Sequence, residues 1–310
     1  MKMSRYTPGL LMGLGLGLLS TAASAQTNAD STGLPGDQFS LQGALELFKQ
    51  AASPEAFEQL LNSESSKVNN LDLNEDGKTD YIRVVSKKEN DVQVFVLQAL
   101  VSDKESQDIA VIELEKTGQD NAVLQIVGDE DIYGEETIVE PSDEDQAVLE
   151  ARPSLLAKGP NLEVLPVDAA TGVIVNVWAW PCVRYVYAPS YRIWVSPWSW
   201  GVRPAWYRPW RPLAWTVYRP IRYHFRPHYT VVHTRRVVYA PRIYRPMRVT
   251  SVTVVNRHQV AVNHYRTTKV NRSVATHGNR HGQVSRKTTT VQGPRGNKVS
   301  RTKTTVRRKH

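Results

Sequence analysis

The sequence has very little cysteine and an uneven supply of charge. Only one of its 310 residues is a cysteine, which excludes a small fold framed by disulfides. All 30 acidic residues lie at or before Asp168, and the residues after it contain 27 lysines and arginines. The acidic half, up to Asp168, also holds 12 basic residues and so has a formal charge of −18, whereas the basic half, from Ala169 onward, has +27. This division predicts a folded domain joined to a basic interaction region.

Long apolar runs are also scarce, and the longest extends from Gly9 to Leu19. A basic start precedes it and Ala23-Ser24-Ala25 follows it, which predicts a signal peptide over residues 1–25, cleaved before Gln26. No later run approaches the roughly 18 apolar residues that suggest a membrane-spanning helix. We therefore expect a periplasmic or secreted protein with no transmembrane span after signal cleavage. In that compartment Cys182 is either a free thiol, which is the expected state, or an intermolecular bridge.

Two short amphipathic patterns follow a polar linker over residues 26–37. Apolar residues recur at helical spacing after Ser40 and again after Ser53-Pro54-Glu55. A serine at these positions can cap a helix, and proline suits the first helical position. The patterns predict two helices, over about 40–51 and 54–63.

Four β-rich runs come next, separated by short polar turns. In the strongest of them Val92, Val94 and Val96 alternate with Phe95 and Leu97, as on the two faces of a strand. Short connections favour an antiparallel meander, and the helices would cover one of its faces. The predicted strands span residues 80–86, 92–101, 109–114 and 122–127.

These elements predict an acidic α+β domain over residues 38–140, with two short helices on a small antiparallel β-meander. Most conventional aliphatic core residues lie there, so we expect this domain to fold on its own. The very acidic run from Asp129 to Asp145 is expected to form exposed loops. The chain after this domain is expected to be largely extended or disordered.

An Asp-rich loop, Asp72 to Asp80, joins the predicted helices to the first strand. Its oxygen-bearing side chains alternate along the loop, and Gly77 stands at position six, where a calcium loop bends sharply. The residues predicted to hold calcium are Asp72, Asn74, Asp76 and Asp80 through their side chains and Lys78 through its carbonyl. Position twelve is Arg83 instead of the bidentate Glu of an EF-hand, so the loop resembles the short Asp-rich loops of extracellular β-propeller and dockerin-like modules. The alternative is a solvated Asp/Gly turn that holds no metal.

The basic half changes composition along its length. All eight tryptophans lie between Trp178 and Trp215, and aromatic-Arg-Pro units such as Tyr218-Arg219-Pro220 follow them. Regular proline removes backbone donors and favours extended chain. The polar tail contains a duplicated unit, 284–291 and 299–306, and its high charge and low hydrophobicity predict disorder. We assign residues 141–170 to an acidic proline-containing linker, 171–215 to a Trp-rich segment of short strands, 216–265 to an extended Arg/Tyr/Pro segment and 266–310 to a disordered basic tail.

The order of these segments resembles a group of uncharacterised exported proteins of Bacteroidota-type bacteria. The resemblance covers most of the mature chain and depends above all on Asn70-Leu71-Asp72-Leu73-Asn74-Glu75-Asp76-Gly77 and Trp194-Val195-Ser196-Pro197-Trp198-Ser199-Trp200-Gly201. It implies export and the same order of an acidic α+β domain and a basic Trp/Tyr/Pro/Arg-rich region. It implies no activity.

Sequence motifs of catalysis are missing, so we predict that the protein is not an enzyme. The sequence has no phosphate-cradling Gly-rich loop, no His-Glu-x-x-His zinc helix and no nucleophile elbow. Arginine and lysine instead attract polyanions, and tryptophan and tyrosine suit a membrane–water interface or stack on nucleic-acid bases.

Ligand contacts are therefore expected in the basic half. The predicted polyanion-binding residues are Arg203, Arg208, Arg211, Arg219, Arg222, Arg226, Arg235, Arg236, Arg242 and Arg245. The predicted aromatic contacts are Trp198, Trp200, Trp206 and Trp210. The function predicted is that of an exported cell-envelope interaction protein that binds lipopolysaccharide or acidic glycans, with peripheral membrane contact. Two alternatives stay open: a periplasmic or extracellular nucleic-acid-binding protein, and a tail that only pairs with its own acidic domain.

Overall fold

The structure is a computed structural model of the chain. It describes residues 31–142, 174–271, 274–279, 282–292 and 298–308. The predicted signal peptide and most of the predicted linker over 141–170 lie outside the described residues. The described chain from Ser31 onward belongs to one compact unit.

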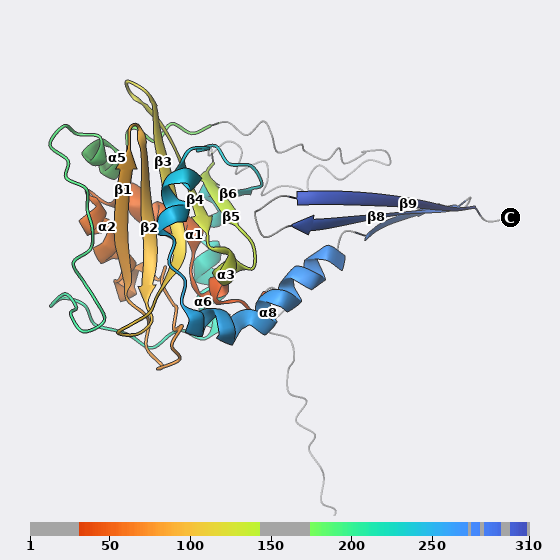
Figure 1. The fold of residues 1–310 in the computed structure, drawn as a ribbon, viewed down its shortest axis with the longest axis horizontal. Helices are drawn as coiled ribbons and strands as arrows, with labels where there is room; N and C mark the ends of the chain where they lie inside the picture. The colour runs from red at the N-terminus through yellow and green to blue at the C-terminus, as the bar shows by residue number, and fades with distance from the viewer. Residues whose placement is uncertain (1–30, 143–173, 272–273, 280–281, 293–297, 309–310) are drawn as a thin grey trace, which may run out of the picture. The chain divides into compact units, whose positions relative to one another are not determined.

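A six-stranded antiparallel sheet, with its strands in sequence order, forms the centre of the molecule (Figure 1). Its strands are β1 (Ile82–Glu89), β2 (Val92–Leu100), β3 (Ser106–Gly118), β4 (Asn121–Gly128), β5 (Thr137–Pro141) and β6 (Tyr229–Val232). The α+β class and the antiparallel meander are confirmed, with β1–β4 shifted or lengthened by a few residues. The sheet is larger than predicted because β5 comes from the acidic run and β6 from the basic half.

The two helices of the acidic half lie where the sequence placed them. Helix α1 (Leu41–Gln50) is capped by Ser40, whose Oγ accepts the backbone N–H of Gly43 at 3.0 Å. Helix α2 (Pro54–Leu61) is capped by Ser53 in the same way. Each cap satisfies a donor that the first helical turn leaves unpaired, so these boundaries follow from local chemistry.

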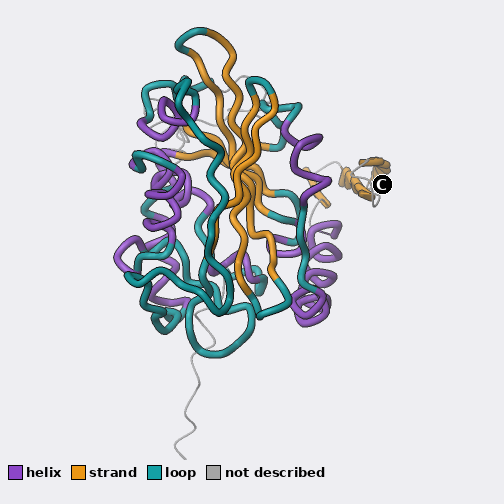
Figure 2. The backbone as a smooth tube through the Cα atoms, turned by 60° about the vertical axis from the view of Figure 1, so that its left-hand side comes forward, coloured by secondary structure: helices purple, strands orange, loops and turns teal. Residues whose placement is uncertain are grey.

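Both faces of the sheet are buried, and the alternation along β2 separates two cores. Phe95 and Leu97 pack with α1 and α2 in the larger core, whereas Val92, Val94 and Val96 belong to the smaller core on the opposite face. Figure 2 shows the sheet nearly edge-on, with helices on both sides. A strand covered on both faces must be apolar on both, and β2 is buried along its whole length.

The acidic run after β4 is structured, so its assignment to exposed loops was wrong. Short helix α3 (Glu130–Tyr133) and strand β5 form within it. Ile132 and Tyr133 enter the large core, and a β-carbon at Gly36 would lie 2.4 Å from the Tyr133 ring. A few apolar residues among the carboxylates therefore decide where this segment packs.

Helices in the basic half replace much of the extended chain that was predicted. They are α5 (Pro181–Val186), α6 (Trp215–Tyr223), α7 (Ala240–Tyr244) and α8 (Val252–Asn271). The prediction of short strands fails at α5, where Cys182, Val183 and Val186 are buried in the large core. The prediction of an extended segment over 216–265 fails because residues such as Tyr218 and Ile243 are buried. Packing of these few residues outweighs the frequent proline and arginine around them.

Both outer strands of the acidic meander are covered by the basic half. Strand β6 pairs with β5 and matches Ile138 with Val232. On the other side Val195 forms an isolated bridge with Val85 of β1. Unpaired strand edges attract other chains, so these two additions protect the sheet.

The basic tail carries a second, separate sheet. Its strands are β7 (Val274–Asn279), β8 (Gly282–Gln292) and β9 (Lys298–Arg308). The two copies of the duplicated unit pair with each other in β8 and β9, with Val284 opposite Val306 and Val291 opposite Val299. In the part of the range 266–310 that the structure describes, where disorder was predicted, residues 274–279, 282–292 and 298–308 form strands. Among the helices that the structure describes, none has the length and apolar character to cross a membrane.

Candidate functional site

One stretch of the basic half, residues 184–211, runs beside the outer side of β1; we call it the arginine–aromatic strip (Figure 1). At its middle the N–H of Ser196 donates to the carbonyl of Val84 at 3.0 Å. Near its end the carbonyl of Trp210 accepts the N–H of Thr79 at 2.8 Å. The strip is therefore attached by backbone bonds at separate points along the edge of the sheet.

A buried carboxylate, Glu58 of α2, anchors the strip to the acidic half. Its Oε1 accepts the hydroxyls of Tyr81 and Ser196, each at 2.7 Å. Its Oε2 accepts the N–H of Val84 at 2.9 Å and the indole N–H of Trp194 at 3.2 Å. Burial raises the pKa of Glu58, although these four donors act in the opposite direction. Two of the four come from the strip, so its position depends on this carboxylate.

Arg203 stands between two aromatic rings within the strip. Its guanidinium carbon lies 5.2 Å from the ring centre of Tyr81 and 5.4 Å from that of Trp200, within the range of cation–π attraction. Burial lowers the pKa of Arg203. Its buried Nη1 makes no hydrogen bond within the described part of the chain, so this cation keeps an unused donor near the buried ring of Tyr81 and the exposed ring of Trp200.

The four predicted aromatic contacts divide into surface and core. Trp200 and Trp206 are exposed, at 37% and 42%. Trp210 is buried, and Trp198 packs against it in a cluster with Tyr81. The first pair can meet a ligand, whereas Trp210 stabilises the attachment of the strip and is not a surface contact.

Three further arginines of the predicted set, outside the strip, also pair with aromatic rings. Arg219 and Arg226 lie over the ring of Tyr223, with guanidinium carbons 5.3 and 3.7 Å from its centre. Arg242 lies 5.6 Å from the ring centre of Tyr239. Arg219 and Arg226 thus contact an aromatic ring outside their own aromatic-Arg-Pro units, and Arg242 belongs to no such unit.

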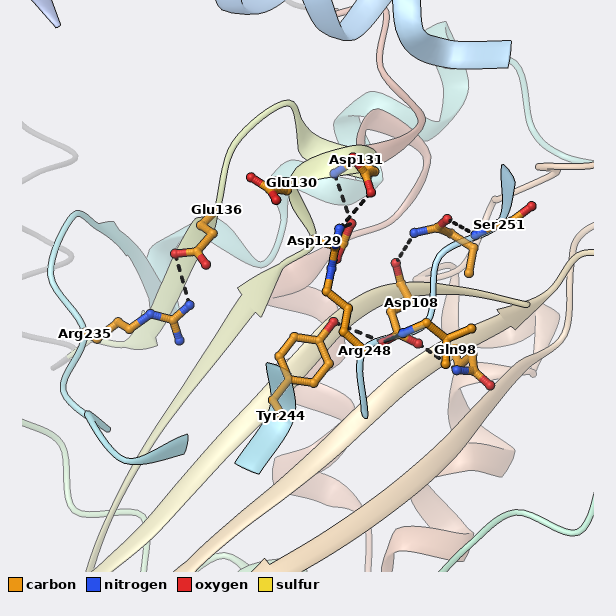
Figure 3. A network of polar contacts seen from close by, with 12 residues as sticks. Gln98, Asp108, Asp129, Glu130, Asp131, Glu136, Arg235, Tyr244, Arg248 and Ser251 are labelled. Atoms are coloured by element: carbon orange, nitrogen blue, oxygen red, sulfur yellow. Dashed lines mark hydrogen bonds and ion pairs between the residues drawn. The ribbon is translucent and has the colours of Figure 1, made fainter. Parts of the chain in front are cut away.

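Three of the predicted polyanion contacts are bound to the acidic half instead. Arg222 lies 3.6 Å from Asp37, and Arg236 lies 3.3 Å from Glu140. Arg235 forms ion pairs with the buried Glu113 and with Glu136, the second of which is drawn in Figure 3. These ion pairs already use the cations inside the fold. By contrast, Arg208, Arg211 and Arg245 are exposed and form no ion pair with any carboxylate in the described ranges.

Arg248 was not among the predicted residues, yet it makes an extensive ion-pair contact (Figure 3). Its Nε lies 2.6 Å from Asp129 Oδ2, and its Nη2 reaches both Asp129 and Asp131, at 2.9 and 2.7 Å. Nearby, buried Asp108 accepts the hydroxyl of Tyr244 at 3.1 Å and the N–H of Val249 at 2.9 Å. The sequence feature that could have indicated this contact is the acidic pair Asp129 and Asp131.

The Asp-rich loop is folded by its own side chains. Asp72 accepts the backbone N–H groups of Asp76 and Gly77, at 3.0 and 2.9 Å, and Gly77 takes the positive φ of 81° that the bend requires. Asp80 is buried and accepts the N–H of Leu73 at 2.6 Å. Burial and the neighbouring carboxylates of Asp72 and Asp76 raise the pKa of Asp80 to about 7.

The loop thus has the compact turn expected from the sequence. Among the residues that the structure describes, no group of three or more His, Cys, Asp and Glu side chains is arranged to hold a metal ion. Calcium binding at Asp72, Asn74, Asp76, Lys78 and Asp80 stays a prediction.

A cavity of about 260 Å³ lies beside this loop. The side chains of Asp37, Asp72 and His258 contribute to its lining. His258 belongs to α8, its buried Nε2 has no hydrogen-bond partner in the described chain, and burial lowers its pKa.

The thiol of Cys182 is free and buried in the large core, and this burial raises its pKa. Because the thiol is enclosed by the core, it is unsuited to an intermolecular bridge.

Comparison with family models, curated proteins and solved structures finds no match to this chain. The resemblance to exported proteins of Bacteroidota-type bacteria therefore stays a prediction. Function has to be argued from the arginine–aromatic strip and its surroundings.

Proposed function

We propose that this is an exported, non-enzymatic cell-envelope protein, periplasmic or secreted, whose basic half binds polyanions such as lipopolysaccharide or acidic glycans. The observation that carries the proposal is the arginine–aromatic strip. It contains no carboxylate side chain, and it exposes Arg208 and Arg211 in the same stretch of chain as the exposed Trp200 and Trp206. Arg208 donates to the carbonyls of Ala205 and Tyr207 but has no carboxylate partner in the described chain. Cations without a carboxylate partner attract phosphate, sulfate and carboxylate groups, and the indole rings add contact area.

The ion pairs divide the arginines of the basic half between two roles. Arg235, Arg236 and Arg248 bind carboxylates of the acidic half and hold the two halves together. The exposed arginines of the strip remain for an external ligand. Charge neutralisation inside the fold therefore lowers the number of cations that face a polyanion, but it does not remove them.

The alternative in which the basic half only pairs with the acidic domain is favoured by those same ion pairs. It accounts for Arg235, Arg236 and Arg248, but it gives no role to Arg208 and Arg211. Nucleic acid is the other alternative, because Trp200 and Trp206 could stack on bases of a single strand.

Binding of the mature protein to three probes tests the proposal: lipopolysaccharide, dextran sulfate and single-stranded DNA, each over a series of salt concentrations. The variant Arg208→Ala/Arg211→Ala should bind lipopolysaccharide and dextran sulfate more weakly. The salt dependence of that binding should also be flatter, because a protein that makes fewer charge contacts releases fewer counterions when it binds. The matched control Lys49→Ala/Lys104→Ala removes the same charge from exposed positions of the acidic half and should bind like the parent.

The outcomes separate the three functions. Stronger binding to single-stranded DNA than to both other probes would favour the nucleic-acid alternative. No binding to any probe at low salt would leave only internal pairing.

We also propose that the Asp-rich loop binds calcium as a stabilising ion and not as a reactive centre. Its oxygen-bearing side chains and the bend at Gly77 support this role, since calcium prefers flexible, oxygen-rich loops. The test is the thermal stability measurement described in the Discussion.

A further inference from the structure

The arginine–aromatic strip exposes an unusual number of apolar side chains. Ile193 is 50% exposed, and Val195 and Val202 are each 57% exposed. Tyr185, Trp200 and Trp206 are exposed in the same stretch. Scattered exposed apolar residues are normal on a protein surface, but here six of them occur within about twenty residues of chain along one edge of the sheet.

Cations alternate with these apolar residues. Arg184 and Arg192 are exposed beside Tyr185 and Ile193, and neither forms an ion pair within the ranges that the structure covers. Together with Arg208 and Arg211 they place positive charge toward both ends of the strip in the sequence, before and after most of its exposed apolar residues. The strip is therefore both apolar and cationic, and a ligand that is only charged would leave the apolar side chains in water.

The strip is also fixed before any ligand arrives. Val195 is exposed while its neighbours Trp194 and Ser196 are tied to Glu58 and β1. Because the two flanking residues are held, Val195 cannot turn inward without breaking bonds to a buried carboxylate. Binding consequently costs little ordering of the backbone.

We propose that the strip is a docking surface for an anionic lipid layer. Ile193, Val195 and Val202 enter the boundary between headgroups and acyl chains, and the flanking arginines contact lipid phosphates. A lipid surface supplies both the negative charge and the apolar interior that the strip requires. The inference rests on the proposed polyanion binding and names the surface on which it occurs.

A second copy of the chain is a less suitable occupant. It would have to bring exposed carboxylates against the arginines and an apolar patch against the valines at the same time. Among the described residues, all large apolar side chains that are exposed belong to the basic half. The acidic half, which has the carboxylates, therefore offers no such apolar patch in its described part.

Partition onto vesicles tests the proposal, with phosphatidylcholine vesicles that contain or lack phosphatidylglycerol as probes. The variant Ile193→Ser/Val195→Ser/Val202→Ser should lower partition onto the anionic vesicles by about tenfold or more, as expected from the apolar area withdrawn. The matched control Val238→Ser/Val252→Ser/Val260→Ser changes three exposed valines outside the strip and should partition like the parent. Binding to lipid-free dextran sulfate should be the same for all three proteins.

A second measurement does not depend on that variant folding. An environment-sensitive dye attached at Ile193→Cys should shift to the blue on anionic vesicles, whereas the same dye at Val260→Cys should not. Cys182 is buried and does not compete for the label.

The outcomes distinguish this inference from the proposed function. Loss of vesicle binding with unchanged dextran sulfate binding supports docking on lipid. Equal vesicle binding by parent and strip variant, or no dye shift at Ile193→Cys, overturns the docking surface while polyanion binding stands. Failure of the parent to bind both lipopolysaccharide and dextran sulfate at low salt overturns the proposed function itself. Self-association of the parent that the strip variant abolishes would assign the surface to a second copy and also overturn docking.

Discussion

Strands β1–β4 and residues 174–267 build the same two cores by different chemistry. The strands contribute alternating valine, isoleucine and leucine, as in β2, where Phe95 faces one core and Val94 the other. The basic half contains one leucine, Leu213, and inserts a few valines and aromatic rings. It is held by polar bonds to buried carboxylates such as Glu58 and Asp129. Strands β1–β4 are held by apolar side chains that alternate along the chain. The basic half is held by hydrogen bonds and ion pairs to particular carboxylates of the acidic half.

This difference shows why an acidic domain buries carboxylates at all. An isolated buried carboxylate is costly, and removal of one partner leaves that cost uncompensated. Glu58, Asp108 and Asp129 each bind groups from residues 194–249. They make the acidic half incomplete without the basic half, and the following experiments examine that dependence.

Separation of the halves should have the largest effect. Residues 31–142 alone would lose Val183 and Val186 from the large core and Ile243 and Tyr244 from the small one. The boundary predicted at residue 140 divides this shared core, so we now expect no cooperative thermal unfolding from the acidic segment alone, measured by circular dichroism. The chain over 31–267 is the control. A cooperative transition at a similar temperature in both would show that the acidic domain is independent.

Replacement of the anchor carboxylate should be next in size. Glu58→Ala leaves four donors without an acceptor and should lower the free energy of unfolding by about 4 kcal/mol, since each unsatisfied buried group costs about 1–3 kcal/mol. The control Ser196→Ala removes only one donor and should lose about 1 kcal/mol. Chemical denaturation measures both. Equal losses in the two variants would mean that Glu58 is not the anchor.

Loss of the Arg248 ion pairs should cost somewhat less. Arg248→Ala leaves Asp129 buried without its cation and should destabilise the protein by about 3 kcal/mol. Arg248→Lys keeps the charge but cannot reproduce the two-pronged contact with Asp129, so an intermediate loss is expected in the same denaturation assay. A loss in Arg248→Ala no larger than that of an exposed control, Arg245→Ala, would contradict the role of this contact.

The pH dependence of stability should be smaller again. The pKa of Asp80 is raised to about 7 in the folded protein by burial and by nearby carboxylates, so the folded state holds a proton that the unfolded chain has lost. This stabilising contribution is complete below pH about 4 and disappears as pH rises through about 7. In chelator, unfolding free energy should fall by about 2 kcal/mol between about pH 5.5 and 7. Asp80→Asn should flatten that slope; identical slopes would rule out Asp80.

Calcium should give the smallest effect. At tenfold excess over its dissociation constant, a single bound ion adds about 1.4 kcal/mol to stability, so millimolar calcium should raise the melting temperature by a few degrees at neutral pH. Asp76→Ala should lose this increase, while Asp103→Ala, an exposed aspartate outside the loop, should keep it. Equal melting temperatures of the parent in calcium and in chelator would reject the site.

Local patterns made the acidic half predictable. Ser40 and Ser53 predict the starts of α1 and α2 because their hydroxyl oxygens accept backbone N–H groups of the first helical turn. The alternation of side chains over residues 92–97 predicts a strand, which the structure places as β2 between the two cores. Strand β5 escaped notice because its apolar residues, Ile138 and Val139, are only two within an acidic run. A pattern that short has no period to detect.

The basic half could not be predicted in the same way. Its structure depends on distant partners: Ser196 binds Glu58, and Tyr218 donates to the carbonyl of Val68 at 2.6 Å. Composition selected both Arg203 and Trp200, and in the structure the guanidinium carbon of Arg203 lies 5.4 Å from the ring centre of Trp200. It could not distinguish the exposed Trp200 from Trp210, which is buried in a cluster with Tyr81.

Because the basic half covers both edges of the acidic meander, it also determines when the sheet can be completed during folding. Ile138 of β5 can pair only after Val232 has been synthesised. Glu58 can bind Ser196 only after the 138 residues that separate them have been made. While the chain is synthesised from its N-terminus, β1 and β5 therefore remain open strands until much of the basic half has emerged. Pairings over such separations form slowly, and open strands aggregate meanwhile. The time during which the chain can aggregate through these open strands is therefore set by the rate at which its second half is made.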